Sequence, residues 1–242
     1  MSEGIIGNIT AVLYYMFFVI SDIIIMFRLL NSQKLSIMFK CLLGSVFGTL
    51  EFQWMPIIFA FFMDFTVKAH ICALVIQVLV FILVILKTNR EQGFINTYKK
   101  PIEWKRFLWE NPASIIIFAS FVIFAYCLNT HTILLNSDGS LHTGQATYGD
   151  MNMHIGFITS IAKQHTFPPE YSIYPGIKLA YPFFSDSISS SLYLLGASLR
   201  VAYIIPMLVA VMQVFCGFYS FIKFWFKKGS VAFIAFILFF YD

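Results

Sequence analysis

The segment from Thr147 to Gly176, TYGDMNMHIGFITSIAKQHTFPPEYSIYPG, gathers acids and histidines in a chain that is otherwise apolar. A carboxylate can take a proton from a hydroxyl group, and an imidazole changes its charge near neutral pH. Asp150 and His154 are four residues apart, which is the spacing that places two side chains on one face of a helix. The segment therefore predicts a helical surface that carries an acid and an imidazole together.

Two helices are expected in this part of the chain, the first from about Asp150 to Gln164. An acid in a first turn is stabilised by free backbone N–H groups, so Asp150 is also explained as a helix cap. The prolines of HTFPPEYSIYPG then predict a rigid, extended connector. A second helix is expected from Tyr181 to Leu199, in which Asp186 either is solvated near the interface or faces a polar cavity.

The composition defines the elements that must position these residues. The chain has 242 residues, of which 59% are hydrophobic and 12% charged, and its mean hydropathy is +0.79, which excludes a soluble domain. A membrane-spanning helix needs about 20 apolar residues. The sequence predicts an all-α, polytopic helical membrane protein with five spans and one incomplete span: Asn8 to Leu29, about Cys41 to Phe65, Ile71 to Leu86, Pro112 to Leu128, Leu199 to Phe226, and Gly229 to Asp242. The incomplete span predicts that the chain is the N-terminal portion of a longer protein.

Lys and Arg residues predict the orientation, because positive charge is retained on the cytoplasmic side of a membrane. Twelve of the sixteen fall at three alternate breaks between the spans. The loop 129–198 is therefore expected on the extracytoplasmic face of the cell membrane, with its helices lying in the interface. The predicted organisation is three transmembrane helices in 1–87, a basic cytoplasmic linker in 88–111, and a core in 112–242.

The cysteines and the net charge narrow the function classes. All four cysteines lie in apolar runs without a CxxC spacing, which predicts neither a disulfide framework nor a zinc site. The net charge of +4 reflects loops of mixed sign, so nucleic acid is not an expected partner.

The loop also resembles a known family. An Asp that begins an interfacial helix just after a span, a His four residues later, FPPE, and then YPG and YPF..D before the next span resemble the first external loop of the GT-C type membrane glycosyltransferase superfamily, and within it the poorly characterised bacterial multi-pass members. The resemblance covers about Ala113 to Asp242. It implies a GT-C-like fold and transfer of a sugar from a polyprenyl-phosphate-linked donor to a cell-envelope glycan or other acceptor.

The resemblance also implies roles for individual residues. Asp150 matches the family's acid, as general base or as a ligand that orients acceptor and donor, and His154 would help to hold the phosphate or the sugar. The rest of the expected substrate-binding set is Glu170, Asp186, Lys178 and Arg200. Many family members carry two acids adjacent or one apart, whereas Met151, Asn152 and Met153 follow Asp150 here. This departure puts a divalent-metal site in doubt, so no metal ligand is assigned, and a divalent metal stays only a possible cofactor. The expected partners are membrane lipid, a polyprenyl-phosphate sugar and a glycan acceptor.

A second class of function is a lipid-carrier or polysaccharide-handling membrane protein without transferase chemistry, such as a flippase or an assembly partner. Ionisable residues in or beside apolar spans, here Asp22, Glu51 and Asp64, would favour it, unless a shift of the second span places Glu51 and Asp64 at the outer surface. Internal repeats and matching broken helices, which are common in transporters, are not visible in the sequence.

Overall fold

The computed structural model describes residues 2–33, 35–92, 112–144 and 148–241. In these ranges four helices are long and apolar enough to cross a membrane, namely Gly4–Leu29, Ile37–Met63, Val67–Asn89 and Leu199–Phe226. They confirm the predicted all-α membrane protein. The other two predicted spans correspond to shorter apolar helices, Ile115–His131 and Gly229–Phe240.

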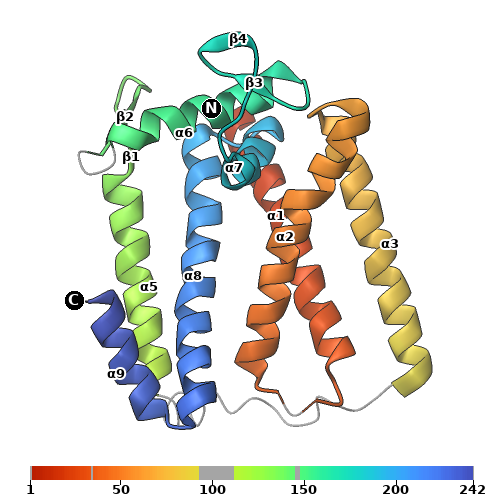
Figure 1. Ribbon diagram of the computed structural model, residues 1–242, viewed down its shortest axis with the longest axis vertical. Coiled ribbons are helices and arrows are strands. Elements are labelled where there is room, and N and C mark those ends of the chain that lie inside the picture. Colours follow the sequence, from red (N-terminus) through yellow and green to blue (C-terminus); the bar gives the residue numbers. More distant parts are fainter. Residues whose placement is uncertain (1, 34, 93–111, 145–147, 242) are drawn as a thin grey trace.

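The bundle is built from α1 (Ser2–Leu29), α2 (Ile37–Met63), α3 (Val67–Gln92), α5 (Pro112–His131), α8 (Leu199–Phe226) and α9 (Gly229–Phe240). Figure 1 shows the long helices running side by side, with the N-terminus at the same end as the polar loop elements. α1 and α2 both contact α8, so the N-terminal helices and the remaining helices form one packed body. The predicted linker 88–111 begins inside α3, and its residues 93–111 lie outside the described ranges.

Two glycines of α2 allow it to pack tightly against α1. A Cβ atom at Gly44 would lie 2.4 Å from Ile23 Cα, and one at Gly48 would lie 2.5 Å from the Phe18 carbonyl oxygen. Glycines four residues apart on one helix let two backbones approach closely in a membrane, where packing drives helix association. This contact fixes α1 against α2.

The polar loop forms a layer at one end of the bundle (Figure 1). It contains α6 (Tyr148–Gln164) and α7 (Phe184–Leu194). It also contains two antiparallel hairpins, β1 (Ile133–Leu135) with β2 (Leu141–Thr143) and β3 (Glu170–Tyr171) with β4 (Tyr174–Lys178). The first helix begins two residues before the predicted Asp150 and ends at the predicted Gln164.

The second helix and the connector differ from the prediction. α7 is shorter than the expected Tyr181–Leu199 because Gly196, at a φ of +102°, turns the chain, and the Ser198 side chain then accepts a hydrogen bond from Val201 N–H at the start of α8. The proline-rich connector leads into the β3–β4 hairpin. The Gln164 side chain holds this hairpin against α6, accepting from Glu170 N–H at 2.9 Å.

The layer is attached to the bundle by apolar packing and by hydrogen bonds. Phe157 and Ile161 of α6 share a buried cluster with Ile57 and Ala60 at the end of α2. The Gln53 amide of α2 donates to the Phe184 carbonyl at the start of α7. α6 and α7 are therefore held in fixed positions over the ends of the spanning helices.

Candidate functional site

His154 and Asp186 form a side-chain pair between α6 and α7. His154 Nδ1 lies 3.0 Å from Asp186 Oδ2 and 3.1 Å from Oδ1. The Asp186 side chain is only 7% exposed, whereas the His154 side chain is 30% exposed. The structure thus joins two of the six predicted site residues, with the acid inside and the imidazole open to solvent.

The electrostatics of the pair suit proton transfer. Burial raises the pKa of Asp186 above its ordinary value, and the hydrogen bond and charge of His154 partly oppose this rise. Tyr203 of α8 also lies near enough to interact with the carboxylate. An Nδ1–H that donates to Asp186 leaves Nε2 as the free acceptor, and the acid fixes this tautomer and the orientation of the ring. In this tautomer Nε2 is the ring nitrogen that can accept a proton, on a side chain that is 30% exposed.

Aromatic rings surround His154. The ring centroid of Phe157 is 6.4 Å from that of the imidazole and Tyr181 is 6.2 Å away, both edge to face. Phe157 in turn contacts Tyr171 of β3 at 5.6 Å. Phe157 is 1% exposed, so its ring packs inside the protein and helps to fix the orientation of the imidazole.

Asp150 occupies the first turn of α6, one turn before His154. It is exposed, and within the described residues no hydrogen bond or ion pair involves its side chain. Both its assignment as general base and its assignment as cap therefore stay predictions.

The other predicted residues are engaged within the protein. Glu170 binds Lys178, with Oε1 3.4 Å from Nζ, and its Oε2 accepts from Gly176 N–H at 3.0 Å. These contacts lower the pKa of Glu170. Arg200 donates to the Asn129 carbonyl at 2.6 Å and the Ile133 carbonyl at 3.0 Å. Glu170 and Lys178 therefore link the two strands of the β3–β4 hairpin. Arg200 joins α8 to the end of α5 and to β1.

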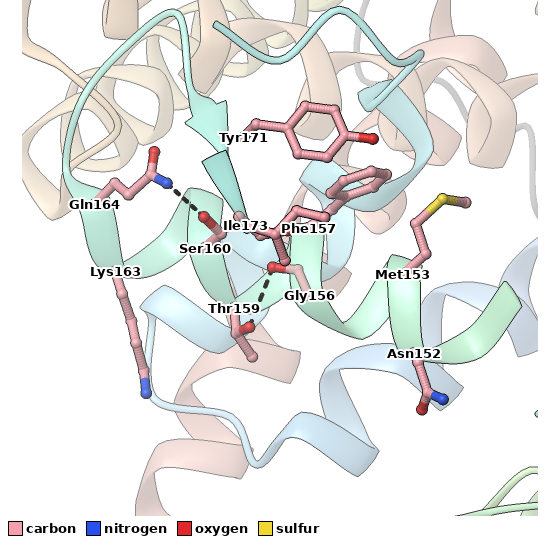
Figure 2. A pocket seen from close by; sticks show the side chains of 11 residues that line it. Asn152, Met153, Gly156, Phe157, Thr159, Ser160, Lys163, Gln164, Tyr171 and Ile173 are labelled. Carbon is pink, nitrogen blue, oxygen red and sulfur yellow. Dashed lines mark hydrogen bonds between the residues drawn. The ribbon is translucent and has the colours of Figure 1, made fainter. Parts of the chain in front are cut away.

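A pocket of about 780 Å³ lies along α6 and the β3–β4 hairpin (Figure 2). Figure 2 shows Asn152, Thr159 and Lys163 projecting from the same side of α6. Lys163 is nine residues after His154, which is two and a half turns at 3.6 residues per turn, so the two side chains leave opposite sides of the helix. None of the six predicted site residues lines this pocket. Phe157, whose ring lies beside His154, is one of the lining residues, so the pocket borders the His154–Asp186 pair.

Metal ligands are not gathered in the described part of the chain, where no group of three or more His, Cys, Asp or Glu residues is positioned to hold an ion. The four cysteines are unpaired. The polar groups of the described site are an acid, an imidazole and tyrosine hydroxyls.

Sequence reasoning named His154 and Asp186 but not their contact, and it missed Gln77. The amide of Gln77 in α3 donates to Asp22 Oδ1 and to Ser21 Oγ of α1, both at 2.9 Å. An amide inside an apolar span was the signal that could have found it, since such a group must be satisfied by another helix.

No protein-family model, curated protein or solved structure matches this chain.

Proposed function

We propose that the protein is a GT-C-like membrane glycosyltransferase that moves a sugar from a polyprenyl-phosphate-linked donor to a cell-envelope acceptor. The His154–Asp186 pair carries this proposal. It presents an oriented, partly exposed imidazole at one end of a bundle whose long helices can cross a membrane, the level at which the headgroup of a lipid-linked donor is expected.

In the proposed reaction the acceptor hydroxyl oxygen attacks the anomeric carbon of the sugar. The bond between that carbon and the phosphate oxygen breaks, and its electron pair leaves with the polyprenyl phosphate. His154 Nε2 takes the hydroxyl proton, and the imidazolium that forms is stabilised by the Asp186 carboxylate 3.0 Å away. A base held in this way contributes about 10²- to 10⁴-fold to the rate.

Charge at the opposite end of the bundle supports an extracytoplasmic site. Arg28 lies in the last turn of α1, Lys223 lies in the last turn of α8, and Lys227 follows α8. Figure 1 shows these two helix ends away from α6 and α7. Basic residues at helix ends favour the cytoplasmic side. The loop layer is then on the outside, where the expected lipid-linked donor and glycan acceptor meet.

The test is release of polyprenyl phosphate from a panel of polyprenyl-phosphate sugars by the purified protein in lipid nanodiscs, with a cell-envelope glycan preparation supplied as the acceptor. We expect turnover by the wild type and its loss in His154→Gln, whereas His142→Gln, a matched change on the β1–β2 hairpin, keeps it. The variant Asp150→Asn tests whether Asp150 or His154 is the base. Loss of turnover in Asp150→Asn with full turnover in His154→Gln would assign the base to Asp150, and no turnover with any donor would refute transferase activity.

The buried polar contacts among the spanning helices favour one alternative, a protein that handles a lipid carrier without sugar transfer. Asp22 is 2% exposed and Gln77 is fully buried, although both belong to apolar helices. Intramembrane acids often mark transport pathways. Movement of a fluorescent polyprenyl phosphate between leaflets of proteoliposomes, with no product formed from any sugar donor, would select this function.

A further inference from the structure

A second polar centre lies inside the bundle, away from the loop layer. It consists of polar side chains from three helices, namely Ser21 and Asp22 of α1, Glu51 of α2 and Gln77 of α3. Ser21, Asp22 and Gln77 are 3%, 2% and 0% exposed. Glu51 is near the midpoint of α2, and it lies close enough to Asp22 and Gln77 to interact with both. These groups meet where the surroundings are apolar.

Two atoms of this centre have no hydrogen-bond partner. The Gln77 Nε2 donates to Asp22 and Ser21, which leaves its Oε1 buried and without a donor. Glu51 Oε2 is also buried and without a donor. Both atoms are acceptors when Glu51 is ionised, so they cannot satisfy each other. An unsatisfied buried acceptor costs about 1–3 kcal/mol.

A single proton on Glu51 gives both of these unpartnered atoms a hydrogen-bond partner. A protonated Glu51 carboxyl becomes a donor, and the Gln77 side chain with which it interacts carries Oε1, a buried acceptor that lacks a donor. Asp22 keeps its charge, because it accepts from Gln77 Nε2. The proton also removes one of two like charges, which in a membrane interior repel each other strongly and are poorly solvated.

We propose that Glu51, Gln77 and Asp22 form an intramembrane proton-binding site, in which Glu51 carries the proton and donates it in a hydrogen bond to Gln77 Oε1. In this chain of hydrogen bonds, the Glu51 O–H donates to Gln77 Oε1, and the Gln77 Nε2–H donates to Asp22. The site goes beyond the proposed transferase activity and does not depend on it.

A metal cation fits this centre poorly. Gln77 Nε2 donates to Asp22 Oδ1 and Ser21 Oγ, which leaves Gln77 Oε1 and Glu51 Oε2 as the oxygens without a donor, fewer than the about six or more oxygen ligands that Ca²⁺ or Mg²⁺ takes. The Ser21 hydroxyl donates to the Phe18 carbonyl at 3.0 Å. A proton needs only one acceptor, which Gln77 Oε1 supplies.

The neighbouring titratable groups are neutral or have their own partners. Tyr15 of α1 bonds Thr49 of α2 at 3.1 Å, and Thr49 also accepts from Gln213 of α8. Tyr14 donates to the His70 carbonyl, and the His70 Nδ1 lies 2.8 Å from the Thr66 carbonyl. Within the described residues no Lys or Arg forms an ion pair with Asp22 or Glu51. A proton is therefore the cation that neutralises the centre.

The test is infrared spectroscopy of the whole chain in nanodiscs at pH 7, in H₂O and in D₂O. We expect a protonated-carboxyl C=O band that is lost in Glu51→Gln and retained in Asp22→Asn and in the exterior control Asp138→Asn. Glutamine keeps the donor to Gln77, so Glu51→Gln is expected to keep the wild-type melting temperature. Uniform ¹³C labelling of glutamate in the wild type must shift the same band, which identifies a Glu even where a variant fails to fold.

Three results would overturn the proposal. The first is a band unchanged in Glu51→Gln and unshifted by labelled glutamate. The second is a band lost in Asp22→Asn and kept in Glu51→Gln, which would place the proton on Asp22. The third is a band that disappears when Na⁺ replaces choline at constant pH, which would make the centre a metal-cation site.

Discussion

The protein has two acid-containing centres, and their surroundings give them different chemistry. Asp186 in the loop layer has an imidazole 3.0 Å away and an opening to solvent through His154. Asp22 in the bundle has an amide donor and a second carboxyl as neighbours, and it is 2% exposed. We propose a substrate hydroxyl as the ligand of the first centre and a proton as the ligand of the second. Residue type alone does not separate these roles.

The two centres also depend on different parts of the fold. The bundle centre exists because α1, α2 and α3 pack closely, with Gly44 and Gly48 at the contact. The surface centre depends on how α6 and α7 lie over the helix ends, where Phe157 and Ile161 pack on α2. Perturbing one part at a time therefore tests whether the centres are independent.

The largest effect is expected from Gly48→Ala, which places a methyl group 2.5 Å from the Phe18 carbonyl oxygen. Because backbone rather than a flexible side chain blocks it, α1 and α2 must separate. We expect a loss of about 1–3 kcal/mol in unfolding free energy, measured by denaturation in mild detergent. Gly4→Ala is the matched control, since a Cβ atom there meets nothing within 4 Å. Equal stability of the two variants would contradict the close α1–α2 contact.

The substitution Asp186→Asn is expected to have an intermediate effect on the unfolding free energy, and this effect depends on pH. Burial raises its folded-state pKa above the unfolded value near 3.8. Its contribution to stability is therefore complete below that value and is lost as the pH rises through the folded pKa. The unfolding free energy of the wild type minus that of Asp186→Asn should fall between pH 3 and pH 7.

Asp138, on the exposed β1–β2 turn, is the control for that measurement. Hydrogen bonds from Ser140 lower its pKa, so its contribution appears as the pH rises and has the opposite sign. A difference for Asp186→Asn that stays flat or rises with pH would show that Asp186 is not a buried acid.

The sequence predicted the spanning helices well and the site only in part. Long apolar runs specify helices by themselves, so α8 begins and ends where it was expected. The hairpins were missed because β3 and β4 are two and five residues long and leave no alternating pattern. The His154–Asp186 contact joins residues 32 positions apart, and the packing of α6 on α7 determines it rather than any local spacing.

The smallest effect is expected from Lys178→Met. Its ion pair with Glu170 is exposed and lies at 3.4 Å, where solvent screens most of the attraction. The melting temperature should stay unchanged, with a faster exchange of the Gly176 amide hydrogen as the local sign. A large loss of activity with a normal melting temperature would instead support the predicted role of Lys178 in substrate binding.

A double-mutant cycle of His154→Gln and Asp186→Asn, measured as release of polyprenyl phosphate at matched protein abundance, tests the central claim most directly. If the two residues act as one proton-accepting unit, each single variant loses about 10²- to 10⁴-fold in turnover and the double variant loses no more than the worse single one. Losses that multiply in the double variant, or a His154→Gln enzyme with wild-type turnover, would contradict the account.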